Sequence, residues 1–275
     1  MNRLRVLFAM IPGILFADPY PIGKGTGYVA FLYSQSFYNS IFLGRNFRHF
    51  TDLGLSGTGI QNEALSLYLY YGISDKDTLV LDSKYHNISD FPEFGASDFE
   101  GLSDTYIGWK RTYRYARDSQ AVELGVRGSR NYDAGKVTAP GRGSTDAIVT
   151  WHWARVLDER QNLGLTLKHE FRDPVPDGYG AQLTFSRTLS SDATIRMFFG
   201  VEKDRDGVNL FGPGFTALPN TNFDFKREMV QVAGLGFSHR IGPEWNILGS
   251  LAFKLDGENS DAAPRSLSFG IGRGF

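Results

Sequence analysis

The sequence SLSFGIGRGF, residues 266–275, ends the chain and decides its fold. Its large apolar residues, Leu267, Phe269, Ile271 and Phe275, share one parity, and serine and glycine occupy the other. Successive side chains of a strand point to opposite faces, so one face of this strand is apolar and the other nearly bare. That pattern predicts a strand between lipid and the polar lumen of a barrel. Arg273 falls on the apolar parity, where a position at the membrane rim lets its side chain reach water.

This ending resembles the closing strand of bacterial outer-membrane barrels, which finishes in phenylalanine after apolar residues at alternate positions. The resemblance implies that Phe269, Ile271 and Phe275 form the signal read by the barrel-assembly machinery. It also implies outer-membrane lipid and lipopolysaccharide as surroundings of the folded chain. The expected localisation is therefore the bacterial outer membrane.

The composition agrees with a membrane barrel. A chain of 275 residues with 14% aromatic residues, 32 glycines and a mean hydropathy of −0.25 is too polar for a helical membrane protein and unusually aromatic for a soluble one. Aromatic girdles and small lumen residues account for both properties. The net charge of −1 predicts no nucleic-acid partner, and the lack of cysteine excludes disulfides, thiolate metal sites and cysteine nucleophiles.

The amino-terminus has the layout of a secretory signal. Arg3 and Arg5 precede the uncharged residues 6–17, and this apolar run is too short to span a bilayer. We expect residues 1–17 to be a signal peptide and residues 18–275 to form a single barrel domain. A short buried helix is the alternative, but the Pro-Gly pair inside the run would interrupt it.

About twelve alternating segments and no convincing helix follow. Among the clearest are residues 62–73 and 163–171, whereas residues 38–59 are expected to be irregular. Tight turns are predicted at residues 74–77, 117–119, 158–160, 190–192 and 242–244, with long connections between them. Long and short connections in strict alternation predict one all-β, up-and-down antiparallel transmembrane barrel with long extracellular loops and short periplasmic turns. A soluble sandwich or lipocalin-like barrel is the alternative, but its outward parity would be charged.

Two motifs carry a second resemblance: Tyr70-Tyr71-Gly72-Ile73-Ser74-Asp75-Lys76-Asp77-Thr78-Leu79 and Gly101-Leu102-Ser103-Asp104-Thr105-Tyr106-Ile107-Gly108-Trp109-Lys110. Together they resemble the outer-membrane channels of the meta-pathway phenol-degradation type. The first motif is ordinary turn chemistry and recurs in unrelated barrels. The resemblance implies a channel or transporter for a small, hydrophobic or aromatic solute.

If the apolar parity faces lipid, the charged residues and histidines of the other parity line the lumen. These residues are Asp82, Lys84, His86, Lys110, Arg114, Glu123, Arg127, Asp146, His152, Lys168, Glu170, Arg172, Arg196, Glu202 and Lys254. About twelve strands enclose either a narrow polar passage or a plug of paired charges. The first hypothesis is a small-solute channel, and a non-conducting structural or export-accessory barrel is the second.

A surface hydrolase is the third hypothesis, because His86, Asn87, Ser89 and Asp90 cluster in sequence. Such a site needs serine within hydrogen-bond reach of histidine, and we expect no enzyme here. The other histidines are scattered singly, so we expect no metal site and no cofactor. Carboxylates in residues 204–206 and 256–261 could hold calcium, but solvated loop charge is the preferred interpretation.

Overall fold

The structure is a computed structural model. It describes residues 19–54, 59–89, 98–115, 117–128, 132–134, 139–210, 212–214, 225–260 and 265–275, without the side chains of Arg114 and Tyr115. The predicted signal peptide and its cleavage site lie outside these ranges. Among the described residues, no helix is both long and apolar enough to cross a membrane.

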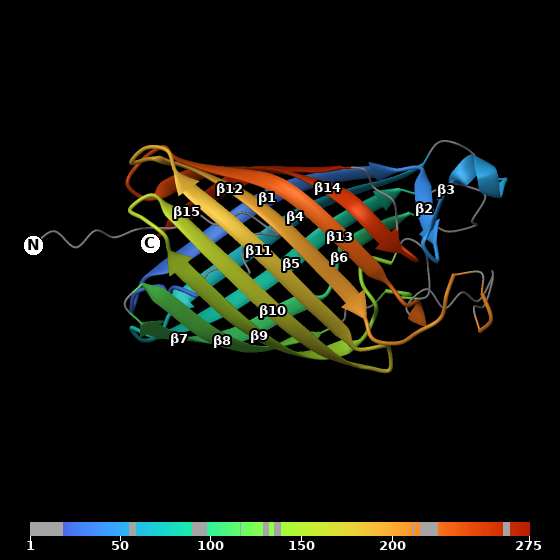
Figure 1. Ribbon diagram of the computed structural model, residues 1–275, viewed down its shortest axis with the longest axis horizontal. Coiled ribbons are helices and arrows are strands. Elements are labelled where there is room, and N and C mark those ends of the chain that lie inside the picture. Colours follow the sequence, from blue (N-terminus) through green and yellow to red (C-terminus); the bar gives the residue numbers. More distant parts are fainter. Residues whose placement is uncertain are drawn as a thin grey trace, which may run out of the picture.

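Twelve long antiparallel strands close into one barrel (Figure 1). They are β1 (Gly27–Tyr38), β4 (Ile60–Gly72), β5 (Asp77–Ser89), β7 (Thr105–Tyr115), β8 (Asp118–Gly128), β9 (Thr145–Val156), β10 (Gln161–Asp173), β11 (Gly178–Thr188), β12 (Ala193–Asp204), β13 (Met229–Arg240), β14 (Trp245–Glu258) and β15 (Ser266–Gly274). Each strand pairs with its neighbours in the chain, and β15 pairs with β1 from Tyr28↔Gly274 to Ser36↔Ser266. The predicted fold is confirmed.

Five short connections join strands at the rim where β1 begins and β15 ends, at the left of Figure 1. Outer-membrane barrels place short turns and both chain ends toward the periplasm, so this is the periplasmic rim. The longer connections lie at the opposite, extracellular rim. One of these is short, because only residues 174–177 separate β10 from β11. The predicted strict alternation of long and short connections is therefore wrong at this point.

The extracellular rim also carries elements that the sequence pattern did not predict. β2 (Ser40–Leu43) and β3 (Asn46–His49) form a hairpin followed by the 3-10 helix η2 (Phe50–Leu53), so the expectation of an irregular stretch is wrong here. A short strand, β6 (Phe99–Leu102), pairs with the extracellular part of β5. Strands of four residues are too short for a periodicity to be recognised.

An apolar band surrounds the barrel. Leu124, Leu183 and Phe269 are 45%, 48% and 65% exposed, and they belong to the parity predicted to face lipid. Exposed aromatic side chains lie near the strand ends, with Tyr71 and Trp245 toward the periplasmic rim. A closed barrel with such a band satisfies its backbone internally and buries its apolar surface in lipid.

The lumen is largely filled in its periplasmic and central parts. An apolar cluster of inward side chains consists of Tyr28, Ala30, Leu32, Tyr68, Tyr70, Val80, Tyr106, Ile148, Phe198 and Leu248. Some of its aromatic rings lie directly against glycines of the wall, since a Cβ at Gly272 or at Gly125 would collide with Tyr28 or Tyr106. Glycines at these positions allow large rings to fold flat inside a narrow barrel.

Candidate solute site in the lumen

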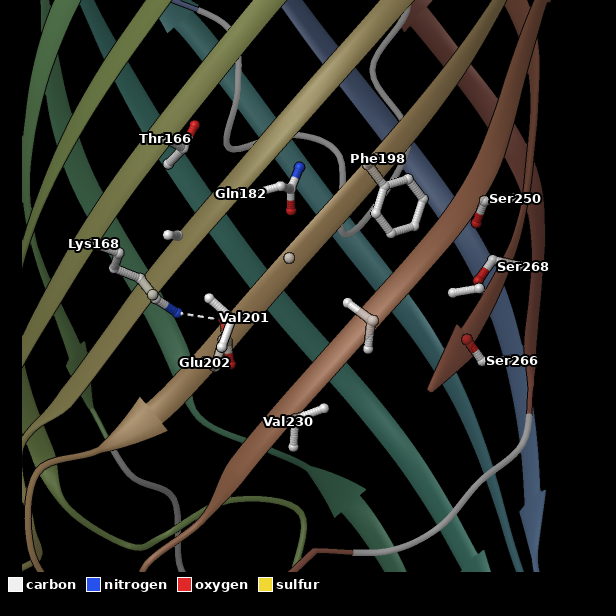
Figure 2. Close-up of a pocket in the computed structure, with 15 residues that line it drawn as sticks. Thr166, Lys168, Gln182, Phe198, Val201, Glu202, Val230, Ser250, Ser266 and Ser268 are labelled. Atoms are coloured by element: carbon white, nitrogen blue, oxygen red, sulfur yellow. Dashed lines mark hydrogen bonds and ion pairs between the residues drawn. The ribbon is translucent and has the colours of Figure 1, made fainter. Parts of the chain in front are cut away.

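A cavity of about 260 Å³ lies in the lumen against strands β10 to β15 (Figure 2). Its lining consists of Thr166, Lys168, Gly180, Ala181, Gln182, Phe198, Gly200, Val201, Glu202, Val230, Val232, Ser250, Ala252, Ser266 and Ser268. Figure 2 shows the Lys168–Glu202 pair on one side and Ser250, Ser266 and Ser268 on the other. The cavity therefore combines a polar wall with a wall of small and apolar side chains.

The space exists because of the alternation that defines the closing strand. The inward parity of β15 carries Ser266 and Ser268, and the neighbouring inward positions of β14 are Ser250 and Ala252. These side chains are too small to reach the centre of the barrel. On the facing side, Gly180 of β11 and Gly200 of β12 have no side chains and leave further space.

Glu170 is the centre of an ion-pair network at the polar wall, and its side chain is only 2% exposed. Lys168 Nζ lies 2.9 Å and Arg127 Nη2 3.1 Å from Glu170 Oε1, and Arg172 contacts the other carboxylate oxygen. A buried carboxylate without cations would be strongly destabilising, so these three bases are what permit its burial.

The same bases reach further carboxylates. Arg127 lies 3.2 Å from Asp146, Lys168 2.9 Å from Glu202, and Arg172 2.8 Å from Asp204. We call Arg127, Asp146, Lys168, Glu170, Arg172, Glu202 and Asp204 the Glu170 cluster. It joins β8, β9, β10 and β12, so its geometry depends on the register of the whole wall.

Arg142 extends this cluster to the extracellular loops. It lies in the connection between β8 and β9, and its guanidinium donates to Asp204 at 2.5 Å, to Glu228 at 3.0 Å and to the Lys226 carbonyl at 2.9 Å. Asp204 ends β12, and the other two residues precede β13. Arg142 thus ties one loop across the mouth to another.

A second residue of the same connection, Tyr132, attaches it to the wall near β7, because its hydroxyl donates to Asp104 at 2.5 Å. Burial raises the pKa of Tyr132, and the adjacent Asp104 carboxylate raises it further. The hydroxyl therefore keeps its proton, and its role as a donor, at neutral pH.

Asn259 joins three extracellular segments. Its Oδ1 accepts from the amides of Gly44 at 2.9 Å and Leu210 at 3.0 Å, and its Nδ2 donates to Asn209 at 2.9 Å and to the Arg227 carbonyl at 2.8 Å. Its side chain is fully buried. No sequence motif indicated Asn259 or Arg142, because their partners come from distant loops.

A second buried polar group lies deeper in the lumen. Tyr106 donates to Glu123 at 2.6 Å, His152 Nε2 lies 3.3 Å from the other Glu123 oxygen, and Lys110 lies over the Tyr70 ring. These residues are on the inward parity of their strands and are less than a tenth exposed. Polar groups here contact one another rather than an open aqueous pore.

The remaining predicted lumen residues lie as follows. Asp82, Lys84 and His86 occupy inward positions of β5, and Arg196 and Lys254 occupy inward positions of β12 and β14. The side chain of Arg114 lies outside the described part of the chain. The cavity itself is lined by only two of the predicted residues, Lys168 and Glu202.

The hydrolase constellation does not assemble among the residues described. His86 Nδ1 lies 3.0 Å from Asn62 Oδ1, while Ser89 has the opposite parity and is exposed. Solvated loop charge is wrong for two carboxylates: Asp204 and Glu258 are 4% and 6% exposed, and arginines contact both. Asp90 lies outside the described residues.

Residues 19–26, ahead of β1, form an inward-folded segment that the sequence pattern did not indicate. Pro19 is fully buried, and its carbonyl accepts from the Thr112 hydroxyl at 2.6 Å. The Ile22 amide donates to Thr78 at 3.3 Å. The prolines and Ile22 ahead of the first strand are the sequence feature that could have indicated an apolar, non-strand contact.

The fold is shared with known outer-membrane channels. The COG4313 outer membrane channel of Pseudomonas putida F1 superposes with a TM-score of 0.74 at 14% identity, over 94% of this chain and 98% of that chain. The NanC porin gives 0.53 at 8% identity over 90% and 98%, and the KdgM porin 0.52 at 8% over 90% and 99%. No family model and no curated protein matches the sequence.

These likenesses show the fold. Together with the apolar band and the closed ring of strands, they define the class of protein as a bacterial outer-membrane β-barrel. The outer-membrane barrel predicted from the closing strand is confirmed.

Proposed function

We propose that this barrel is an outer-membrane channel for a small, partly apolar solute, which it holds in the lumen cavity. The observation that carries the proposal is a cavity of about 260 Å³ inside the barrel. An engineered cavity of about 150 Å³ is enough to bind benzene, so the space suits one ring with short substituents. Lys168, Glu202 and the serines of its lining offer hydrogen bonds, and Phe198, Val230 and Val232 offer apolar contact.

The resemblance of the two sequence motifs to channels of the phenol-degradation type supports testing aromatic solutes first. The structural neighbours carry "channel" and "porin" in their names, which supports transport of some solute. The choice of a small, partly apolar solute rests on the cavity.

A non-conducting structural barrel is the second candidate, and the Glu170 cluster favours it. Its charges already pair with one another, and the apolar cluster fills the lumen below. Side-chain charges that pair with one another in a confined space leave little free charge and little room for mobile ions, so the current should be small. A channel must therefore rearrange part of this filling when the solute passes.

A pair of neighbouring residues on β15 separates the two candidates. Ser268 lines the cavity, whereas Leu267 points to lipid. Ser268→Trp fills the cavity with an indole ring, and Leu267→Trp places the same ring in the apolar band. Swelling of proteoliposomes in phenol and in glucose measures uptake by each variant.

We expect Ser268→Trp to lose most phenol uptake and Leu267→Trp to retain it. Both variants should remain heat-modifiable on gels, which shows that the barrel has formed. Equal uptake by the two variants would show that phenol does not pass through the cavity, and no uptake by the unaltered protein would favour the non-conducting barrel.

A further inference from the structure

The periplasmic mouth of the lumen is occupied by the chain's own residues 19–26. Thr112 of β7 and Thr78 of β5 both point inward and both bond the backbone of this segment, at Pro19 and Ile22. The segment returns to the wall where Gly25 donates to the Gly72 carbonyl at 2.8 Å and Gly72 donates to the Thr26 carbonyl at 3.0 Å. It therefore crosses from one part of the wall to another.

The segment is fitted closely to the barrel. A Cβ on Gly72 would collide with the carbonyl oxygens of Ile22 and Gly23, so the backbone lies directly on the inner surface of β4. The Ile22 side chain packs against the apolar cluster above it. The cluster and the segment thus lie between the cavity and the periplasmic rim.

The attachment is nevertheless of a kind that can be reversed. The contacts include hydrogen bonds from neutral groups, the burial of Pro19 and the packing of Ile22. The segment joins β1 through Gly25, which has φ of +73° and open space around its Cβ position. Glycine adopts this backbone conformation without strain and can change it readily, as a hinge requires.

We propose that residues 19–24 are a displaceable stopper of the periplasmic mouth, which swings about Gly25 to release solute from the lumen. The inference rests on the proposed channel function, because a stopper acts only on a barrel that conducts. It makes the amino-terminal segment, rather than an extracellular loop, the part that controls exit.

A disulfide tests the stopper, and the chain contains no cysteine to interfere. Ile22→Cys with Thr78→Cys places two thiols at neighbouring positions, since the Ile22 amide nitrogen lies 3.3 Å from Thr78 Oγ1. The oxidised double variant should pass severalfold less solute than the same protein after dithiothreitol. The two single-cysteine variants, treated identically, are the controls and should not respond.

Thr112→Cys gives a readout that does not depend on conduction. Thr112 is 2% exposed beneath Pro19, so its thiol should react slowly with a water-soluble maleimide. Adding Ile22→Asp puts a charge against the apolar cluster and should release the segment, speeding labelling severalfold. Locking the segment through Cys pairs at 22 and 78 should slow labelling of Thr112→Cys further.

These measurements separate the two proposals. Gated labelling without any solute uptake would support a displaceable segment but count against the channel, and with it against the control of solute exit. Equal uptake in the locked and reduced protein, equal labelling with and without Ile22→Asp, or failure of the two cysteines to cross-link would each overturn the stopper.

Discussion

Glu170 shows how single residues hold this lumen together. It is buried at the centre of three bases, two of which come from its own strand at positions two before and two after it. Alternation places all three side chains on one face, which the sequence predicted. Arg127 and the outer carboxylates come from other strands, and their identity depends on register, which alternation alone does not fix.

Removal of Arg172 should leave Glu170 and Asp204 without a shared cation. We expect Arg172→Met to lower the free energy of unfolding by about 1.5–3 kcal/mol, because Glu170 and Asp204 each lose a charge-assisted hydrogen bond but keep another cation. Urea titration of the barrel in lipid vesicles measures the change. Arg155→Met is the matched control, since Arg155 pairs with Asp118 at the exposed rim, where solvent screens the pair and its loss should change stability little. Equal losses in both variants would contradict the importance of the cluster.

Among the structural elements, the extracellular loops depend on Asn259. Asn259→Ala should leave the Gly44 and Leu210 amides without their acceptor, at about 1–3 kcal/mol for each buried group. We expect rapid proteolysis of the extracellular loops in intact cells while the barrel stays heat-modifiable. Asn259→Asp keeps the acceptor but loses both donated bonds, so it should be intermediate. Unchanged proteolysis of the alanine variant would show that other contacts hold the loops.

The closing strand is the second element whose role can be tested. Phe275 bonds Gly27 through its backbone in both directions, and its ring lies against Gly27. Deletion of Phe275 should reduce the amount of heat-modifiable barrel in the outer membrane, with proteolysis of the unassembled chain. Phe275→Tyr keeps an aromatic ring and should assemble better than the deletion. Normal barrel levels after deletion would contradict the predicted assembly signal.

The elements also show the limits of sequence reasoning. Long strands such as β10 and β15 repeat their alternation often enough to be recognised, and the parity of each was correct. The hairpin of β2 and β3 repeats too few times. The cavity could not be predicted, because it depends on which small residues of β14 and β15 face Lys168 and Glu202 across the lumen.

For the whole molecule, a closed ring of hydrogen-bonded strands has no free edge at which unfolding begins. We expect the mature chain to begin near residue 18, to fractionate with the outer membrane and to migrate faster on a gel before boiling than after it. Mass spectrometry of the mature chain and the gel shift check this. Cytosolic protein that retains Met1 would contradict it.

Asn259 also makes the joining of the extracellular loops a late step in the formation of the barrel. Its partners, Gly44, Asn209, Leu210 and Arg227, are all translated before it. The extracellular loops that Asn259 joins cannot reach their final arrangement until the connection between β14 and β15 has been synthesised. An antibody that recognises the joined loops would therefore bind complete barrels but not chains that still lack the hairpin of β14 and β15.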